Sequence, residues 1–131
     1  RENISRRKGE AEQATVLMRP LVENRQAIER EQGGLVILRA EYGVLNAASK
    51  SQTNRRAAEV VDVTVALAAL VNESQLSLPR GLDKAQLIGF WDPSPLRRKQ
   101  LVVDYLFDGK RHHVKSSNRD PLHLPMRAHE V

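Results

Sequence analysis

Apolar and polar residues alternate most regularly between positions 60 and 71. The apolar row at every second position consists of Val61, Val63, Val65 and Leu67. A period of two is typical of a β-strand with one face on the core. The pattern predicts a strand over 60–71, and we expect its apolar row to share the core with Leu101, Val103 and Tyr105.

A different spacing, typical of an amphipathic helix, runs from residue 1 to about residue 32. Its apolar positions lie three and four residues apart and comprise Ala11, Ala14, Leu17, Met18, Leu21 and Ile28. Gly33 and Gly34 end the pattern. We expect this stripe to pack on a sheet of the same domain. A coiled-coil or oligomer seam is the alternative, but the sustained heptads that it needs are missing.

Pro20 lies inside this helical pattern. A proline in a helix interior removes one hydrogen-bond donor and crowds the preceding turn. The sequence therefore predicts either a kink near residues 16–19 or two shorter helices.

The rest of the chain has the pattern of short strands joined by loops. An apolar run at 35–42 predicts a strand, and a shorter run at 76–78 predicts another. Residues 45–59 contain few core-forming side chains and are expected to form a long loop. Prolines keep the tail at 121–125 extended.

The clearest supersecondary unit is a β-hairpin. Apolar residues alternate along 100–107, and the following Asp108-Gly109 is typical of a two-residue type I′ turn. Such a turn fixes the register of the two strands. The predicted pairs are Phe107 with Lys110, Tyr105 with His112, Asp104 with His113, and Val103 with Val114.

Together these patterns predict an α+β fold. We expect an N-terminal amphipathic helix at about 1–32, packed on an antiparallel β-sheet or small β-sandwich of about five strands at about 34–126. A chain of 131 residues has the size of one domain and can bury roughly two-thirds of its unfolded surface. We therefore expect 1–131 to be a single domain. Because it begins with Arg, we expect it to be a piece of a longer protein.

Charge and composition narrow the classes of function. Lys and Arg number 21 against 16 Asp and Glu, and the resulting charge of +5 suits acidic proteins, nucleic acid or anionic lipid. The chain has no cysteine, which excludes disulfides and thiolate metal sites. No apolar stretch approaches the roughly 20 residues of a membrane-spanning helix.

Signals for catalysis and cofactor binding are poor. His112 and His113 are neighbours in a predicted strand and point to opposite faces, so they cannot hold one metal ion together. Asp104 facing His113 is more typical of a cross-strand charge pair than of an acid–base catalyst. Phosphate-binding loops and nucleophile elbows are missing. We expect no catalytic residue, no metal and no cofactor.

Two groups of residues are candidates for binding a partner. The first, which contains the only tryptophan, is Phe90, Trp91, Asp92 and Pro93. An aromatic pair in a loop either anchors the core or contacts a partner, and the scarcity of aromatic residues favours the core. The second group, which suits phosphate contacts but has no aromatic neighbour for base stacking, is Lys50, Arg55 and Arg56.

A series of short motifs, in order along the chain, resembles a known family. The series is Gly34-Leu-Val-Ile, Ala40-Glu-Tyr-Gly43, Val61-Asp-Val-Thr-Val-Ala-Leu67, Leu76-x-Leu78, Lys84-Ala-x-Leu87, Gly89-Phe-Trp-Asp-Pro93, Leu101-Val-Val-x-Tyr105 and Leu122-x-Leu-Pro125. Its order and spacing are similar to those of the C-terminal domain of mitochondrial J-domain proteins of the DnaJ homologue subfamily C member eleven type. The resemblance covers nearly the whole chain.

This resemblance implies a mitochondrial protein that is associated with the outer membrane and linked to cristae organisation. In the family, an N-terminal J domain recruits a heat-shock chaperone through a His-Pro-Asp tripeptide. None of the four histidines in this chain precedes a proline. A heat-shock chaperone is therefore an expected partner only through a J domain that this chain lacks.

The function that we expect is a non-catalytic protein–protein interaction or scaffold domain of such a co-chaperone. Its expected partners are proteins of the mitochondrial membrane-organising complex and of the sorting and assembly complex. The alternative is a basic module that binds RNA or anionic lipid. The cationic residues are scattered and lack aromatic neighbours, which disfavours nucleic acid. The sequence leaves a peripheral membrane contact open.

Overall fold

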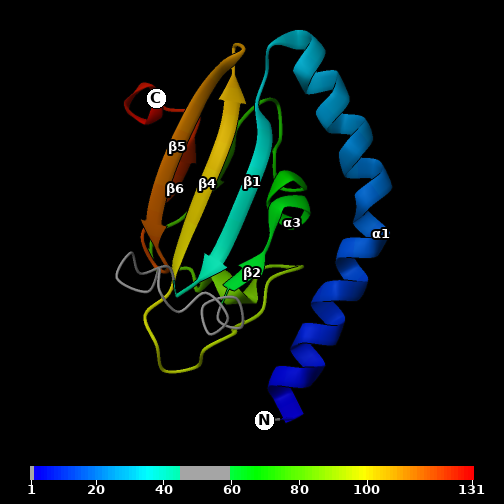
Figure 1. Ribbon diagram of the computed structural model, residues 1–131, viewed down its shortest axis with the longest axis vertical. Helices are drawn as coiled ribbons and strands as arrows, with labels where there is room; N and C mark the ends of the chain where they lie inside the picture. The colour runs from blue at the N-terminus through cyan, green and yellow to red at the C-terminus, as the bar shows by residue number, and fades with distance from the viewer. Residues whose placement is uncertain (1, 45–59) are drawn as a thin grey trace, which may run out of the picture.

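The computed structural model describes residues 2–44 and 60–131 (Figure 1). Their helices, strands and 3-10 turns (η) are α1 Glu2–Gln32, β1 Val36–Gly43, β2 Val60–Asp62, α3 Thr64–Ala68, β3 Leu76–Leu78, η2 Lys84–Gln86, β4 Gln100–Phe107, β5 Lys110–Ser117, β6 Leu122–Leu124 and η3 Arg127–His129. One antiparallel sheet has the order β2-β1-β4-β5, and β3 pairs with β6 in a second sheet. This arrangement confirms the predicted α+β fold.

Helix α1 runs alongside the larger sheet, and the short helix α3 lies between α1 and β1 (Figure 1). The α1 side chains that face inward include Ala11, Met18 and Val22, and Val22 belongs to the hydrophobic core. The predicted stripe is therefore only partly correct, because Leu17, Leu21 and Ile28 are exposed. A contact made mainly with the five-residue α3 is narrow, so few apolar side chains of α1 can take part.

Pro20 does not divide the helix, since α1 continues without interruption from Glu2 to Gln32. The prediction of two shorter helices is wrong. Pro20 and Leu17 lie on the exposed side of α1. Because proline has no amide hydrogen, one carbonyl of the preceding turn lacks its helical donor, and water can hydrogen-bond to that carbonyl on this side.

The predicted end of the helix at Gly33 and Gly34 is confirmed. The Gly33 amide donates to the Arg30 carbonyl at 3.3 Å, and the Gly34 amide donates to the Glu29 carbonyl at 2.8 Å. Gly33 has φ +71°, the left-handed conformation that this helix ending requires. The Glu29 carboxylate then accepts the Leu35 amide at 2.9 Å, which fixes the entry into β1.

The long strand predicted over 60–71 is wrong. Strand β2 ends at Asp62, whose carboxylate accepts the Thr64 amide at 2.9 Å and so begins a turn that continues as α3. The alanine-rich sequence that follows favours a helix over a strand. In the helical spacing, the fully buried positions are Val63, Ala66, Leu67 and Ala68, whereas Val61 and Val65 are half-buried.

The predicted hairpin is confirmed pair by pair. Strands β4 and β5 pair in the expected register, and Asp108 and Gly109 both have positive φ, as a type I′ turn requires. The buried row of β4 is Leu101, Val103 and Tyr105, as predicted. It completes a core that also contains leucines from the β3–β6 pair.

The C-terminal segment is attached to this hairpin through Tyr105. The Met126 amide donates to the Tyr105 hydroxyl at 3.1 Å, and that hydroxyl lies 2.6 Å from His129 Nδ1. Burial and the nearby His112 lower the pKa of His129, so the folded state favours a neutral ring that accepts the hydroxyl hydrogen. Glu130, the residue after His129, pairs with Lys110 at 3.9 Å.

We expect stability to fall as the pH drops below the ordinary histidine pKa of 6.5, because the unfolded chain then binds a proton that folded His129 resists. The loss should continue until the pH passes the lower pKa of the folded state. Thermal melting of wild type and His129→Gln across this range measures the effect. The variant should show a flatter profile, and identical profiles would contradict the role of His129.

Candidate docking surface

The loop at 87–99, between η2 and β4, carries the aromatic candidates. Phe90 is only 1% exposed, and its ring packs edge-on against Tyr42 with 5.6 Å between centroids. The interpretation of Phe90 as a core anchor agrees with this position, which leaves the ring no surface for a partner. Pro93 is half-buried in the same loop.

Trp91 follows Phe90 but lies at the surface, where it is half-buried. The Lys8 ammonium of α1 sits 5.4 Å from the centroid of the indole ring, within the range of a cation–π contact. Trp91 and Lys8 both border a groove of about 580 Å³, whose other lining residues are Ala11, Glu12, Thr15, Val16, Arg19, Val60, Val61, Asp62 and Gly89.

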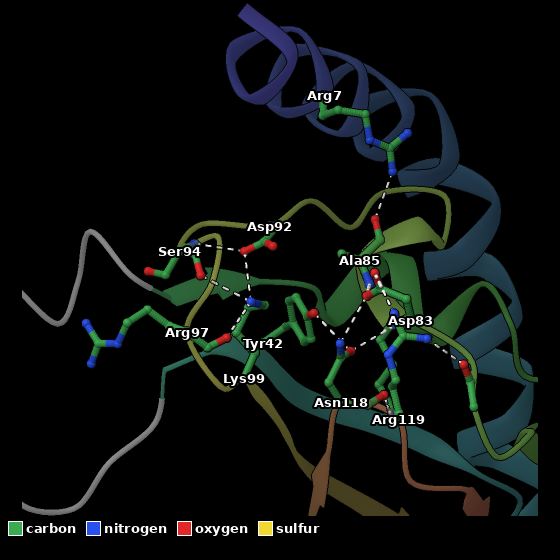
Figure 2. Close-up of polar contacts among 12 residues, drawn as sticks. Arg7, Tyr42, Asp83, Ala85, Asp92, Ser94, Arg97, Lys99, Asn118 and Arg119 are labelled. Atoms are coloured by element: carbon green, nitrogen blue, oxygen red, sulfur yellow. Dashed lines mark hydrogen bonds and ion pairs between the residues drawn. The ribbon is translucent and has the colours of Figure 1, made fainter. Parts of the chain in front are cut away.

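A second groove of about 490 Å³ lies between the start of α1 and the same loop. It is lined by Arg6, Arg7, Glu10, Ala85, Gln86, Asp92 and Pro95. Arg7 bridges its two sides, since one guanidinium nitrogen donates to the Ala85 carbonyl at 2.8 Å (Figure 2). We call the exposed and half-buried residues around these grooves the Trp91 surface, which comprises Arg6, Arg7, Lys8, Trp91 and Pro95.

Asp92 supports the loop from inside. Its carboxylate accepts the Ser94 amide at 2.9 Å and lies 3.2 Å from the ammonium of the buried Lys99. That ammonium also donates to the carbonyls of Ser94 and Arg97, at 3.1 and 2.6 Å (Figure 2). The Asp92 carboxylate therefore stabilises the conformation of its own loop.

A buried polar network behind the loop holds η2 against the end of β5. The Lys84 ammonium donates to the carbonyls of Ser117, Asn118 and Asp120, at 2.9, 2.6 and 2.9 Å. The Asn118 amide oxygen accepts the Tyr42 hydroxyl at 3.0 Å and the Lys84 amide at 2.9 Å (Figure 2). This network fixes the loop that carries Trp91.

The ionisation of this network follows from its burial. Burial lowers the pKa of Lys84 and raises the pKa of Tyr42 well above its ordinary value. Burial also pushes the pKa of Asp83 upward, but hydrogen bonds from Asn118 and the Ala85 amide, with the charge of Arg119, bring it below its ordinary value. The shifts of Tyr42 and Asp83 both move the pKa further from pH 7, so Tyr42 is neutral and Asp83 ionised there, as their hydrogen bonds require.

The basic group of candidate partner-binding residues is the second one that the sequence indicated. Lys50, Arg55 and Arg56 lie outside the described residues. The cation beside the Trp91 ring is instead Lys8 of α1, and Arg19 lines the same groove. Proximity between residues 8 and 91 leaves no signal in a single sequence, so sequence reasoning missed it.

A contact between a histidine and a carboxylate lies on the β4–β5 hairpin. Asp104 and His113 form the predicted cross-strand pair, with Oδ1 and Nδ1 2.7 Å apart on a partly exposed sheet face. Within 2–44 and 60–131, no three His, Asp or Glu side chains are grouped so that they could hold a metal ion. In the same part of the chain, no helix combines the length and the apolar character needed to cross a bilayer.

Comparison with known proteins gives consistent matches. The family model described as DnaJ-like protein C11, C-terminal, matches residues 1–125. DnaJ homolog subfamily C member 11 of Mus musculus is 39% identical over 131 residues, which cover 98% of this chain and 22% of that protein. Its homolog in Dictyostelium discoideum is 35% identical over 127 residues, with coverage of 95% and 22%. No solved structure matches the chain.

A further relative is an uncharacterized J domain-containing protein of Schizosaccharomyces pombe. It is 34% identical over 131 residues, which cover all of this chain and 21% of that protein. The chain thus spans about a fifth of the length of these relatives. The family match extends from α1 to β6, the elements that build the core and the Trp91 surface, and so this chain belongs to the DnaJ-like protein C11 family as its C-terminal domain.

Proposed function

We propose that this domain is a non-catalytic docking module of a mitochondrial, outer-membrane-associated J-domain co-chaperone linked to cristae organisation. The observation that carries the proposal is the placement of Trp91 at the surface, beside a groove that α1 also lines, on a loop held by hydrogen bonds from Lys99. A tryptophan provides a large, rigid contact area, and tryptophan and arginine are enriched among the residues that dominate binding energy.

The Trp91 surface has the composition of an interface centre with a polar rim. The indole ring supplies the apolar contact, and Arg6 and Lys8 supply cations at its edge. Because the loop is held by Asp92 and Lys99, its conformation is already ordered before a partner binds. Such preorganisation lowers the entropic cost of association.

The proposed partners are proteins of the mitochondrial membrane-organising complex and of the sorting and assembly complex. Contact with a heat-shock chaperone belongs, in this proposal, to the J domain of the full-length protein. The Schizosaccharomyces pombe relative is named as a J domain-containing protein, which supports this division of tasks.

We expect Trp91→Ala to weaken the capture of these complexes from a mitochondrial extract by about thirtyfold, since truncating a central interface tryptophan typically costs at least 2 kcal/mol. The measurement is quantitative mass spectrometry of proteins retained by the immobilised domain. Leu17→Ala is the matched control, because Leu17 is 71% exposed on the outer face of α1. Equal loss in both variants, or no loss in Trp91→Ala at unchanged melting temperature, would contradict the proposal.

A further inference from the structure

A leucine at the tip of the loop 93–98 has no contact that explains its position. Leu96 has a relative exposure of 103% and φ +71°, in the left-handed region. This conformation is unfavourable for a residue with a Cβ, and full exposure returns no burial energy. Folding of the domain itself therefore gains nothing from a leucine here.

The loop is nevertheless held in this shape. The ammonium of Lys99 binds the carbonyls of Ser94 and Arg97, and the Arg97 amide donates to the Ser94 carbonyl at 3.1 Å. These bonds close the chain on both sides of Leu96. The outward position of the leucine is thus a property of the folded loop, which projects from one end of the molecule as a yellow segment in Figure 1.

Cationic side chains surround this tip. A groove of about 940 Å³ beside it is lined by Val44, Leu96, Arg97, Arg98, Lys99, Gln100, Lys115, Ser117, Asn118, Arg119 and Asp120. Arg98 and Lys115 are exposed and meet no carboxylate of a described residue. Among the described residues, Asp120 is the acidic residue that lines the groove. Two of the lining cations already have carboxylate partners, since Arg119 lies 3.7 Å from Asp83 and Lys99 lies 3.2 Å from Asp92.

We propose that this basic tip, defined as Leu96, Arg98 and Lys115, binds the surface of a bilayer that contains anionic phospholipid. Leu96 enters the boundary between headgroups and acyl chains, and the cations contact headgroup phosphates. A projecting apolar residue with cations around it is the chemistry that such a surface binds.

The geometry favours a bilayer over other acidic partners. None of the described residues that line this groove is aromatic, so they offer no platform for stacking the bases of a single-stranded nucleic acid. A single projecting leucine is also far smaller than the apolar centre of a stable protein interface. The Trp91 surface is formed by other residues, so the two proposals can fail independently.

The absence of cysteine allows a direct test on the 131-residue chain. Leu96→Cys carries a single environment-sensitive dye, and vesicles consist of phosphatidylcholine alone or of phosphatidylcholine and phosphatidylserine in equal parts. We expect a blue shift and brighter emission only with the anionic vesicles. The matched control is Leu17→Cys, whose dye sits on an exposed position of α1, outside the basic tip, and should not respond.

Unlabelled variants separate the two parts of the tip in a vesicle co-sedimentation assay. Arg98→Ala with Lys115→Ala should lower vesicle binding by about tenfold or more and flatten its dependence on salt. Leu96→Ser should lower binding while leaving the salt dependence unchanged. Equal binding to uncharged vesicles, an equal response at position 17, or binding of single-stranded RNA or polyglutamate without any vesicle binding would overturn the proposal.

Discussion

Replacing Lys84 by methionine is expected to destabilise the domain by about 3 kcal/mol or more, since a hydrogen bond contributes roughly 1 kcal/mol and a charged donor contributes more. Methionine keeps the apolar stem of the buried side chain but cannot donate to the carbonyls of Ser117, Asn118 and Asp120, which accept hydrogen bonds from the Lys84 ammonium. Three carbonyl acceptors would then lose the charged donor that the buried Lys84 side chain supplies.

Urea unfolding of wild type and Lys84→Met measures this loss, and thermal melting should show a decrease of about 10 °C. Lys115→Met is the matched control, because Lys115 lies on the exposed face of β5 and its replacement should change stability by less than about 0.5 kcal/mol. A Lys84→Met protein as stable as the control would show that this network does not hold the fold.

Val63→Asp is expected to prevent folding at ordinary temperature. Val63 is 2% exposed and joins β2 to α3, and its amide donates to the Ala40 carbonyl at 2.9 Å, so the position cannot move into solvent without breaking the edge of the sheet. A carboxylate buried there without a partner costs more than about 4 kcal/mol, a large part of the stability of a typical domain.

Circular dichroism and size-exclusion chromatography of Val63→Asp test this directly. Val16→Asp introduces the same change at a position of α1 that is 67% exposed, and this control should remain folded. A soluble Val63→Asp domain with the melting temperature of wild type would show that Val63 does not face the core.

Features that depend on residues close together in the chain were predicted correctly from the sequence. Asp108-Gly109 determines the type I′ turn, and the turn determines every pair of the β4–β5 hairpin. Gly33-Gly34 likewise ends α1 by a short-range hydrogen-bond pattern. These features depend on residues that are neighbours in the chain, so they were predictable.

Where two local preferences compete, the prediction was wrong. Val61, Val63, Val65 and Leu67 fit a strand, but Val63 and Leu67 also fit one side of a helical turn. The carboxylate of Asp62 and the following alanines favour the helix. Apolar periodicity over so few residues does not distinguish the two.

The candidate site was only partly predictable, for a different reason. The sequence shows that Phe90 and Trp91 are adjacent aromatic residues, but which ring is buried depends on Tyr42, far away in the chain. The basic neighbour of Trp91 is Lys8, which comes from α1. Lys99, whose ammonium holds the loop, has no distinguishing feature in the sequence. Such long-range contacts exist only after folding.

The salt dependence of partner capture tests the docking account most directly. The domain is immobilised, and a mitochondrial extract is applied at low and at physiological ionic strength, with wild type and Trp91→Ala in parallel. We predict that capture of the membrane-organising and sorting and assembly complexes by wild type changes little with salt and is lost in Trp91→Ala, because an apolar centre dominates the final affinity. Capture that falls by roughly a hundredfold over this salt range and is indifferent to Trp91→Ala would contradict the account.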